Sequence, residues 1–230
     1  MNSSHTTSQH GNLTEIADER YIRNTLRYVT GEMLDTTGSV LVIGSGDASF
    51  ENRIRGINSS LNLTSIDFNE EYREKISDIS DTVIIDDFLT YRFDRTFDYI
   101  VCIDVLEHIL DTDTFLKNTH RALAEDGVFY LQTPNLASWH GRLALLFGYT
   151  PEPMEVSNVK NYFGKLWFMR DDTPIHHVRI FTYRALREMC SYYGFEVLKA
   201  VGVDHRIPFL FRPFPGIAAQ ICLKLRKKGK

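Results

Sequence analysis

The chain has 230 residues, with 26 Lys and Arg against 30 Asp and Glu, which gives a formal net charge of −4. This acidic balance offers no general attraction to nucleic acid, and 43% hydrophobic residues are enough for the large core of a globular domain. No apolar run reaches the roughly 20 residues of a transmembrane helix. Cys102, Cys190 and Cys222 are far apart in apolar contexts, which favours reduced thiols and a cytoplasmic location.

The N-terminal region divides into a polar tail and a helix. Residues 1–13 are almost entirely polar and predict a disordered tail, so residues 14–230 form one domain. From Glu15 to Leu34 the apolar residues follow a helical spacing, which predicts a helix with one buried stripe. The stripe consists of Ile22, Leu26, Val29 and Met33.

A glycine loop follows the first predicted strand. Val40 to Ile43 form a short apolar run that indicates a buried strand, and Gly44 and Gly46 bring the backbone round a tight turn. Asp47 then has the chemistry of an N-cap for a helix beginning at about Ala48. A helix start directs its N–H groups at the turn, so the loop is either a cradle for a nucleotide-like ligand or an ordinary strand–helix turn.

The second strand, Leu61 to Ile66, ends at Asp67. In a parallel sheet this strand lies beside the first one, so Asp67 is expected next to the glycine loop, where a carboxylate can accept the hydroxyls of a ribose. An N-cap before Asn69 is the alternative role. Phe68 either lies against an adenine ring or covers the core.

The third strand, Thr82 to Ile85, stops at Asp86, Asp87 and Phe88. Two carboxylates and an aromatic ring at a strand end can bind the amino group and the ring of an adenine. The alternative is that these residues form a solvated turn. Tyr99 to Ile103 form a fourth buried strand, and Asp104, Glu107 and His108 follow its carboxyl end.

Helices alternate with these strands. A helix is predicted from about Thr112, and Gly127 turns the chain into a fifth strand from Val128 to Gln132. This alternation predicts a parallel, doubly wound α/β sheet.

The C-terminal third adds a helix from Thr182 to Tyr193 and a sixth strand from Phe195 to Val203. Apolar residues then alternate with other residues, which favours a half-buried seventh strand. The apolar set consists of Ile217, Ala219, Ile221, Leu223 and Leu225. A basic amphipathic helix on a membrane surface is the alternative interpretation of residues 217–226. The aromatic, proline-rich stretch 207–216 before it predicts either another wall of the acceptor site or a lipid-facing patch, so peripheral membrane contact through this C-terminal segment is an alternative.

Six features in this order and spacing resemble the class I S-adenosylmethionine-dependent methyltransferases. The likeness covers about Val40 to Val203 and is greatest to the small-molecule branch that includes the ubiquinone-biosynthesis O-methyltransferases. The features are the glycine loop, Asp67, Phe97-Asp98 with Asp104 to His108, Leu123 to Val128, Thr133 to Asn135, and His177 to Thr182.

The resemblance implies a Rossmann-like fold with a seven-stranded sheet, its last strand antiparallel beside the sixth, and helices on both faces. It implies S-adenosylmethionine as the cofactor and assigns residues to each of its parts. Gly44, Ser45 and Gly46 would cradle the methionine part, Asp67 would hold the ribose, Phe68, Asp87 and Phe88 would flank the adenine, and Cys102, Asp104 and Val105 would line the other side.

Two positions depart from the family pattern. The family usually has an acidic residue where this chain has Val42, and often a third glycine where it has Ala48. The first departure is expected to loosen the surroundings of the methionine amine. The second is expected to cost little, because alanine is small.

Residues 136–175, between the fifth strand and the helix at Thr182, are rich in aromatic residues and contain Pro151 and Pro153. Their place beside the cofactor edge predicts an aromatic lid over an acceptor, although such rings also complete cores. The aromatic residues are Trp139, Phe147, Tyr149, Tyr162, Phe163, Trp167 and Phe168.

Methyl transfer requires donor and acceptor to be held in line, and a general base only where the acceptor must lose a proton. His108 and His140 are the candidate bases, and His176 and His177 are the less favoured candidates. No metal ion is expected, and the alternative is a divalent cation held by Asp104, Glu107 and His108.

The sequence therefore predicts an enzyme that methylates an oxygen or nitrogen of a small, aromatic or lipid-like acceptor. A methyltransferase fold that has lost catalysis and acts as a binding module is the main alternative, because of Val42 and Ala48. An NAD-dependent dehydrogenase is less favoured, since its fingerprint places a third glycine at Ser49. Nucleic-acid substrates are not expected, and the sequence gives no prediction of oligomeric state.

Overall fold

The structure is a computed structural model that describes residues 28–167, 170, 172–204 and 208–229. The predicted disordered tail and the first part of the predicted N-terminal helix lie outside these residues. Residues 28–31 are helical, and Val29 and Met33 are buried as expected for the stripe of that helix. Within the described residues, no helix combines the length and apolar character needed to cross a membrane.

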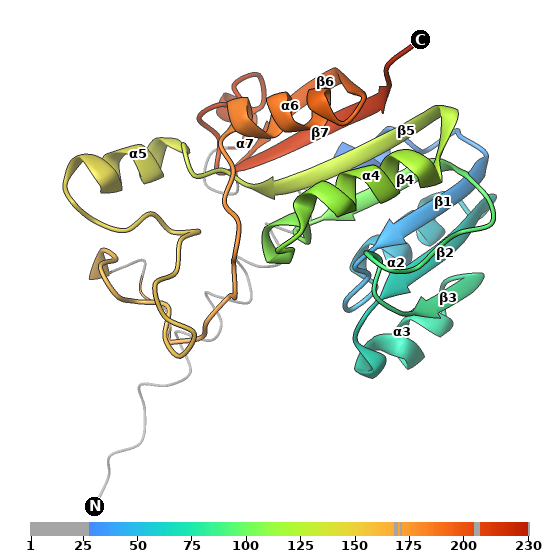
Figure 1. Ribbon diagram of the computed structural model, residues 1–230, viewed down its shortest axis with the longest axis horizontal. Helices are drawn as coiled ribbons and strands as arrows, with labels where there is room; N and C mark the ends of the chain where they lie inside the picture. The colour runs from blue at the N-terminus through green and yellow to red at the C-terminus, as the bar shows by residue number, and fades with distance from the viewer. Residues whose placement is uncertain (1–27, 168–169, 171, 205–207, 230) are drawn as a thin grey trace, which may run out of the picture.

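A seven-stranded sheet forms the centre of the molecule, in the order β3-β2-β1-β4-β5-β7-β6 (Figure 1). The first five strands are parallel, and β7 runs antiparallel to both of its neighbours. The strands are β1 Gly38–Ile43, β2 Leu61–Asp67, β3 Thr82–Ile85, β4 Phe97–Ile103, β5 Leu123–Pro134, β6 Phe195–Val203 and β7 Gln220–Lys227. The predicted fold class is confirmed.

Helices and short helical turns connect the strands. Asp111 caps α4 by accepting the N–H of Thr114 at 2.9 Å, and Thr182 caps α6 by accepting the N–H of Ala185 at 3.2 Å. The elements are α2 Ser49–Ile57, η1 Glu70–Tyr72, α3 Arg73–Ser77, η2 Leu106–His108, α4 Thr112–Ala122, α5 Trp139–Leu146, α6 Tyr183–Tyr192 and α7 Pro208–Phe211.

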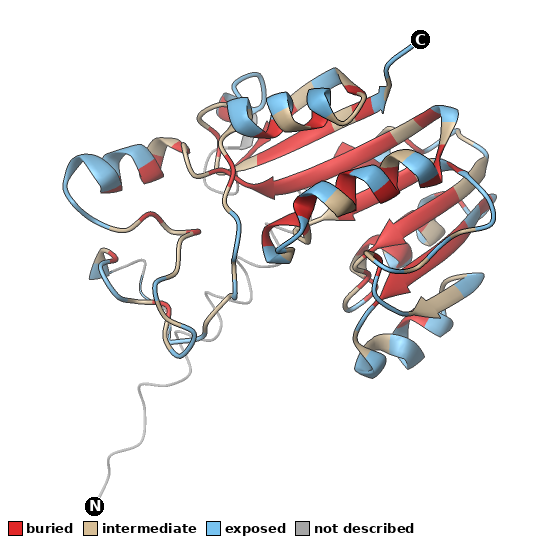
Figure 2. Cartoon of the chain, in the orientation of Figure 1, coloured by how far each residue is buried: buried red, intermediate tan, exposed pale blue. Residues whose placement is uncertain are grey.

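The two faces of the sheet carry two separate cores, because side chains alternate between the faces along each strand. On one face Leu41 and Cys102 pack with α4 and α6. On the other face Val40, Val42 and Val101 pack with α2 and with residues 28–33. Figure 2 shows the resulting band of buried residues through the central strands. This alternation decides which side chains can face a ligand beside α2.

Strand β7 lies between β5 and β6, where the resemblance places an inserted antiparallel strand. The strand interpretation of these residues is therefore confirmed, and the amphipathic-helix alternative is wrong. The expectation of a half-buried strand is also wrong, since Ile221, Cys222 and Leu223 are consecutive and all fully buried. A strand with neighbours on both edges and helices on both faces buries both of its sides.

Two predicted boundaries differ from the structure. Strand β5 begins at Leu123, ahead of the turn predicted at Gly127, because Leu123 already pairs with Phe97 before a bulge shifts the register. In residues 136–175, α5 and the irregular chain after it stand apart from the sheet (Figure 1). Phe147 and Trp167 are 72% and 80% exposed there, so a closed aromatic lid is not confirmed.

Candidate functional site

The glycine loop links the carboxyl end of β1 to α2. Gly44 has φ +72°, and a Cβ on it would overlap a methyl group of Val105, so this position requires glycine for its conformation and for its close packing. Gly46 has φ +51°, but a Cβ there would meet nothing within 4 Å. The loop therefore leaves open space at Gly46 for a ligand.

The residues that follow the loop correct two predictions. Ala48, not Asp47, occupies the N-cap position of α2, and the Asp47 carboxylate instead accepts the N–H of Ser49 at 3.0 Å. Ala48 is buried in a left-handed conformation with φ +63°. Replacing a glycine by alanine at this point carries a backbone cost of about 1 kcal/mol, which its small size does not remove.

Asp67 lies beside the glycine loop, as the parallel pairing of β1 and β2 requires. One carboxylate oxygen accepts the N–H of Gly46 at 2.8 Å, and the other accepts the N–H of Asn69 at 2.9 Å. The carboxylate is thus fixed in orientation by the loop itself. Each oxygen keeps a second lone pair, so the group can still accept a ligand hydroxyl.

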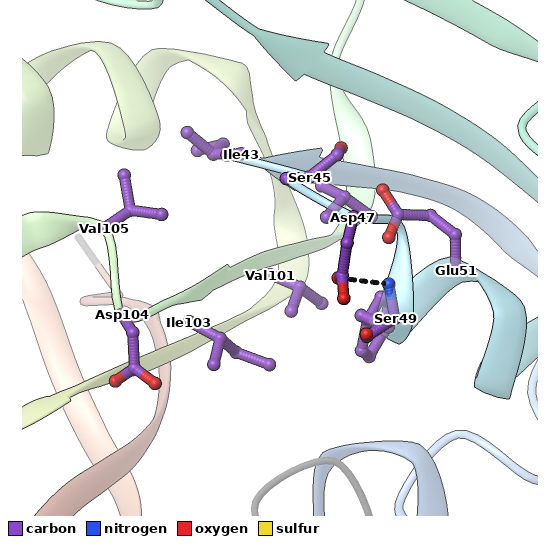
Figure 3. A pocket seen from close by; sticks show the side chains of 13 residues that line it. Ile43, Ser45, Asp47, Ser49, Glu51, Val101, Ile103, Asp104 and Val105 are labelled. Carbon is purple, nitrogen blue, oxygen red and sulfur yellow. Dashed lines mark hydrogen bonds between the residues drawn. The ribbon is translucent and has the colours of Figure 1, made fainter. Parts of the chain in front are cut away.

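A cavity of about 260 Å³ lies between the glycine loop, the start of α2 and the end of β4 (Figure 3). Among the predicted residues it includes Gly44, Ser45, Gly46, Asp104 and Val105. Cys102 is not among them: it is fully buried on the opposite face of β4, in the core with α4. The neighbours of Cys102, Val101 and Ile103, line the cavity, because successive side chains of a strand point to opposite faces.

The residues predicted for the adenine are in different environments. Phe68 is 84% exposed directly after Asp67, where its ring is accessible to a ligand. Phe88 is buried and packs on Phe115, with ring centroids 5.2 Å apart, so it belongs to the core. Asp87 is exposed and its Oδ1 accepts the N–H of Leu89 at 2.8 Å, as in the solvated-turn alternative.

Glu51, which the sequence interpretation missed, is a fully buried carboxylic acid on the cavity side of α2. Its Oε1 accepts the hydroxyl of Ser65 at 2.8 Å. Burial raises the pKa of Glu51, while the Ser45 and Ser65 hydroxyls act against that increase. A signal was present in the sequence: Glu51 precedes the buried Ile54 by three residues, so both occupy the buried face of a helix.

Asp104 stands at the point where β4 ends. It is one of three residues other than glycine with positive φ among the described residues, with φ +54°. Its N–H donates to the carbonyl of Gln132 at 3.1 Å, and its side chain lies 3.5 Å from Gln132 Nε2. Asp104 is also one of the residues that line the cavity. A strained backbone at the edge of a cavity is typical of ligand sites.

The residues after Asp104 form an acid–histidine trio made of Glu107, His108 and His177. One ligand atom from each residue lies within 4.8 Å of the others, which suits either proton transfer or a divalent cation. The structure thus groups Glu107 and His108 with His177, whereas the cation site considered from the sequence grouped them with Asp104. His177 comes from the far side of the segment 136–175, and no local spacing could have indicated it.

Burial and charge perturb two members of the trio. Burial, followed by the negative charge of Asp104, raises the pKa of Glu107 well above its ordinary value, although Thr133 donates to its Oε2 at 2.9 Å. Burial likewise lowers the pKa of His177. Burial thus favours the uncharged forms of Glu107 and His177, and Glu107 Oε1 lies 3.9 Å from His177 Nε2.

The hydrogen bonds of the two histidines fix their tautomers. His108 Nδ1 lies 3.1 Å from the carbonyl oxygen of His176, and His177 Nδ1 lies 2.8 Å from that of Pro153. A carbonyl oxygen only accepts, so each Nδ1 carries the proton and each neutral ring presents an unprotonated Nε2. His108 is exposed, which leaves its Nε2 accessible to a substrate.

His140, the other predicted base, has a different environment. It is buried on α5, its Nδ1 lies 3.5 Å from Glu152 Oε2, and its ring contacts Trp139 edge-on. It does not line the cavity at the glycine loop, and neither does any other described residue of 136–175. His108 does not line this cavity either, but it lies in the turn directly after the lining residues Asp104 and Val105 and groups with Glu107 and His177. The structure therefore places His108, and not His140, next to the other candidate residues.

Comparison with known proteins gives one family and many similar folds. Residues 13–200 match a family described as "Methyltransferase domain". No curated protein matches the sequence. Among solved structures, an S-adenosylmethionine-dependent methyltransferase from Clostridium acetobutylicum is similar, with a TM-score of 0.62 and 13% identity over 96% of this chain and 99% of that chain.

Two further structures have the same fold. A protein from Thermotoga maritima, described as a "possible histamine N-methyltransferase", has a TM-score of 0.65 and 16% identity over 95% of each chain. A magnesium protoporphyrin IX methyltransferase from Synechocystis, with bound S-adenosylhomocysteine, has a TM-score of 0.63 and 10% identity over 99% of this chain and 90% of that chain. At these identities the likeness shows the fold.

Proposed function

This chain belongs to a family of methyltransferase domains, and we propose that it transfers a methyl group from S-adenosylmethionine to an oxygen or nitrogen of a small acceptor. The observation that carries the proposal is the cavity at the glycine loop. Three of its lining residues are acidic, namely Asp47, Glu51 and Asp104, and none is basic. Such a lining favours a ligand with positive charge over the anionic pyrophosphate of a dinucleotide.

The residues present fit this cofactor. S-adenosylmethionine supplies, when bound, an electrophilic methyl group on a positively charged sulfur. Gly46 leaves space for close approach of a ligand, Asp67 offers fixed carboxylate oxygens to ribose hydroxyls, and Phe68 offers an exposed ring to the adenine. The chain's contribution to catalysis is to hold the donor in place and to exclude water from it.

His108 is proposed as the general base for acceptors that must lose a proton. Its carbonyl partner fixes the tautomer with an unprotonated Nε2, and it follows the cavity-lining pair Asp104 and Val105 after one short helical turn. Glu107 and His177 support this ring from behind, with the two imidazole centroids 4.9 Å apart. A phenol or alcohol is the acceptor class that such a base serves best.

The experiment is a calorimetric titration of the full chain with S-adenosylhomocysteine, with NAD titrated in parallel. Micromolar binding of S-adenosylhomocysteine alone is the expected result. Binding of NAD alone would replace the proposal with redox chemistry. Binding of neither compound would favour a non-catalytic binding module, the alternative that Val42 and the strained Ala48 suggest.

Acceptors are then screened with radiolabelled S-adenosylmethionine against a panel of phenols, amines and quinol analogues. We expect turnover with at least one phenol, because a phenol must lose its proton as it is methylated. If only neutral amines are methylated, the reaction needs no general base. That result would contradict both the role of His108 and the assignment of a phenol or alcohol as the acceptor.

A further inference from the structure

Glu51 is a buried acid with one unsatisfied oxygen. The residue is fully buried, yet neither Oε2 nor the hydroxyl of Ser45, which is close enough to affect the pKa of Glu51, makes a hydrogen bond of ordinary geometry among the described residues. An unpaired buried carboxylate oxygen is destabilising, and natural proteins rarely leave one without a reason. Because Glu51 lines the cavity at the glycine loop, a ligand that donates hydrogen bonds there would satisfy it.

The Ser65 hydroxyl, which is itself next to that of Ser80, holds the carboxylate of Glu51 in a defined orientation. The Ser65 hydroxyl donates to Oε1 at 2.8 Å, and Ser65 in turn lies 2.8 Å from the hydroxyl of Ser80. Both serines come from the β2–β3 side of the sheet, whereas Glu51 comes from α2. The carboxylate is therefore fixed between the helix and the sheet before any ligand binds, with Oε1 engaged and Oε2 available.

The position of Ser65 places this carboxylate beside the end of β1. Ser65 pairs in register with Val42, and side chains in register on neighbouring parallel strands point to the same face. Val42 lies on the α2 face and lines the same cavity. The carboxyl group is thus brought from α2 to the place where β1 presents the apolar side chain of Val42.

We propose that Glu51 accepts a hydrogen bond from the α-ammonium group at the methionine end of the donor, and so supplies the acidic group that Val42 does not. An ammonium group has three N–H donors for Oε2, whereas a sulfonium has none. The inference rests on the proposed donor site. It makes Glu51 a residue that selects ligands with an amino-acid end rather than one that takes part in the chemical step.

The test compares two ligands on two proteins by calorimetry. The ligands are S-adenosylhomocysteine and its analogue in which hydrogen replaces the α-amino group. The proteins are the full wild-type chain and Glu51→Gln, which keeps the size and the hydrogen-bonding shape of the side chain. We expect Glu51→Gln to weaken S-adenosylhomocysteine binding about 10- to 100-fold and to change binding of the deamino analogue by less than about threefold.

Glu74→Gln on α3 is the matched control, since it neutralises an exposed glutamate away from the cavity, and it should leave both ligands unaffected. Equal weakening of both ligands in Glu51→Gln would assign Glu51 a purely structural role and overturn the inference. So would unchanged S-adenosylhomocysteine binding, while the donor site itself would stand. A wild-type chain that does not bind S-adenosylhomocysteine would overturn the proposed function as well.

One measurement needs no variant. The wild-type chain is expected to bind S-adenosylhomocysteine at least about tenfold more tightly than the deamino analogue, because the analogue leaves Oε2 unpaired. Equal affinity for the two ligands would overturn the inference, whatever the folding behaviour of Glu51→Gln.

Discussion

The glycine-loop side and the segment 136–175 of this molecule are built in opposite ways. On the first side, backbone conformations and short contacts fix nearly every group, from Gly44 against Val105 to Asp67 on the N–H of Gly46. On the second side, Phe147 and Trp167 are largely exposed, and α5 stands apart from the sheet (Figure 1). The proposed donor site is thus preformed, whereas the segment proposed for the acceptor has little packed structure around it.

This difference agrees with the two roles that the proposed function gives to these regions. A cofactor common to a family can be held by rigid elements, because the ligand does not change. Residues 136–175 are tied to the rest of the domain where Leu136 and Trp139 donate to the carbonyls of Phe181 and Ile217, each at 2.8 Å, and where the Pro153 carbonyl accepts from His177 at 2.8 Å. His177 of the acid–histidine trio makes the last of these contacts, so the trio lies at the junction between the segment 136–175 and the rest of the domain.

The largest effect is expected for a variant of His108, in the acid–histidine trio. His108→Gln should lower kcat for a phenolic acceptor about 10²- to 10⁴-fold, because a glutamine amide cannot act as a base from this position. The affinity for S-adenosylhomocysteine should stay within about threefold of wild type, since the donor half is untouched. Steady-state kinetics and calorimetry measure the two quantities.

His176→Asn is the control for His108→Gln. It removes the neighbouring exposed imidazole but keeps the carbonyl that binds His108 Nδ1, and asparagine tolerates the positive φ of 59° at that position. It should retain most activity. A similar loss of kcat in both variants would show that the ring of His108 is not the base.

A second variant breaks the rigid half. Gly44→Ala combines a left-handed backbone conformation with overlap against Val105, and should lower the free energy of unfolding by about 2–5 kcal/mol. For a chain of this size that corresponds to a fall in Tm of roughly 5–15 °C. Differential scanning calorimetry measures it, and Gly46→Ala is the matched comparison, with an expected cost of only about 1–2 kcal/mol.

Addition of Val105→Ala to Gly44→Ala separates the two causes. Removing the methyl groups of Val105 should recover the overlap part of the loss and leave the backbone part. A double variant as unstable as the sum of the two single variants would contradict the packing explanation.

Asp67→Ala tests the ribose contact of the preformed half. Loss of charge-assisted hydrogen bonds to two hydroxyls should weaken S-adenosylhomocysteine binding by about 2–3 kcal/mol, or roughly 30- to 150-fold. Asp67→Asn, which keeps one carbonyl acceptor for the N–H of Gly46 or Asn69, should lose less. Binding by Asp67→Ala as tight as that of wild type would place the ribose elsewhere.

The smallest expected effect concerns stability and pH. The folded-state pKa of Glu51 is raised above its ordinary value of 4.5, so the folded chain holds this proton more tightly than the unfolded chain. The contribution of Glu51 to stability is therefore present at low pH and is lost as the pH rises above 4.5. Glu51→Gln cannot ionise, so it should be more stable than wild type by on the order of 1–3 kcal/mol at pH 8, and by less at pH 5.

Guanidinium unfolding at the two pH values measures the difference. A Glu51→Gln chain that is more stable but binds the donor more weakly is the signature of a functional group kept at a cost in stability. A variant that is less stable than wild type at pH 8 would contradict the assignment of Glu51 as a strained buried acid.

Local sequence patterns predicted much of the donor side. The apolar run before Gly44, the position of Asp67 at the end of β2 and the alternation of strands and helices gave the sheet and the glycine loop, and the family match confirms the methyltransferase resemblance at the level of the family. The ubiquinone branch stays a prediction. These features were accessible because a tight turn and a strand end depend on residues within a few positions of each other.

Tertiary structure decided the rest. The packing of α2 and α4 on opposite faces of the sheet decides which side chains of β4 line the cavity. Val101 and Ile103 line it, in place of the predicted Cys102. His177 joined Glu107 across a long excursion of the chain, and Glu51 reached Ser65 from a different element. The sequence by itself determined the elements and the glycine loop through short-range geometry, whereas partners distant in sequence were decided only when the sheet and helices packed together.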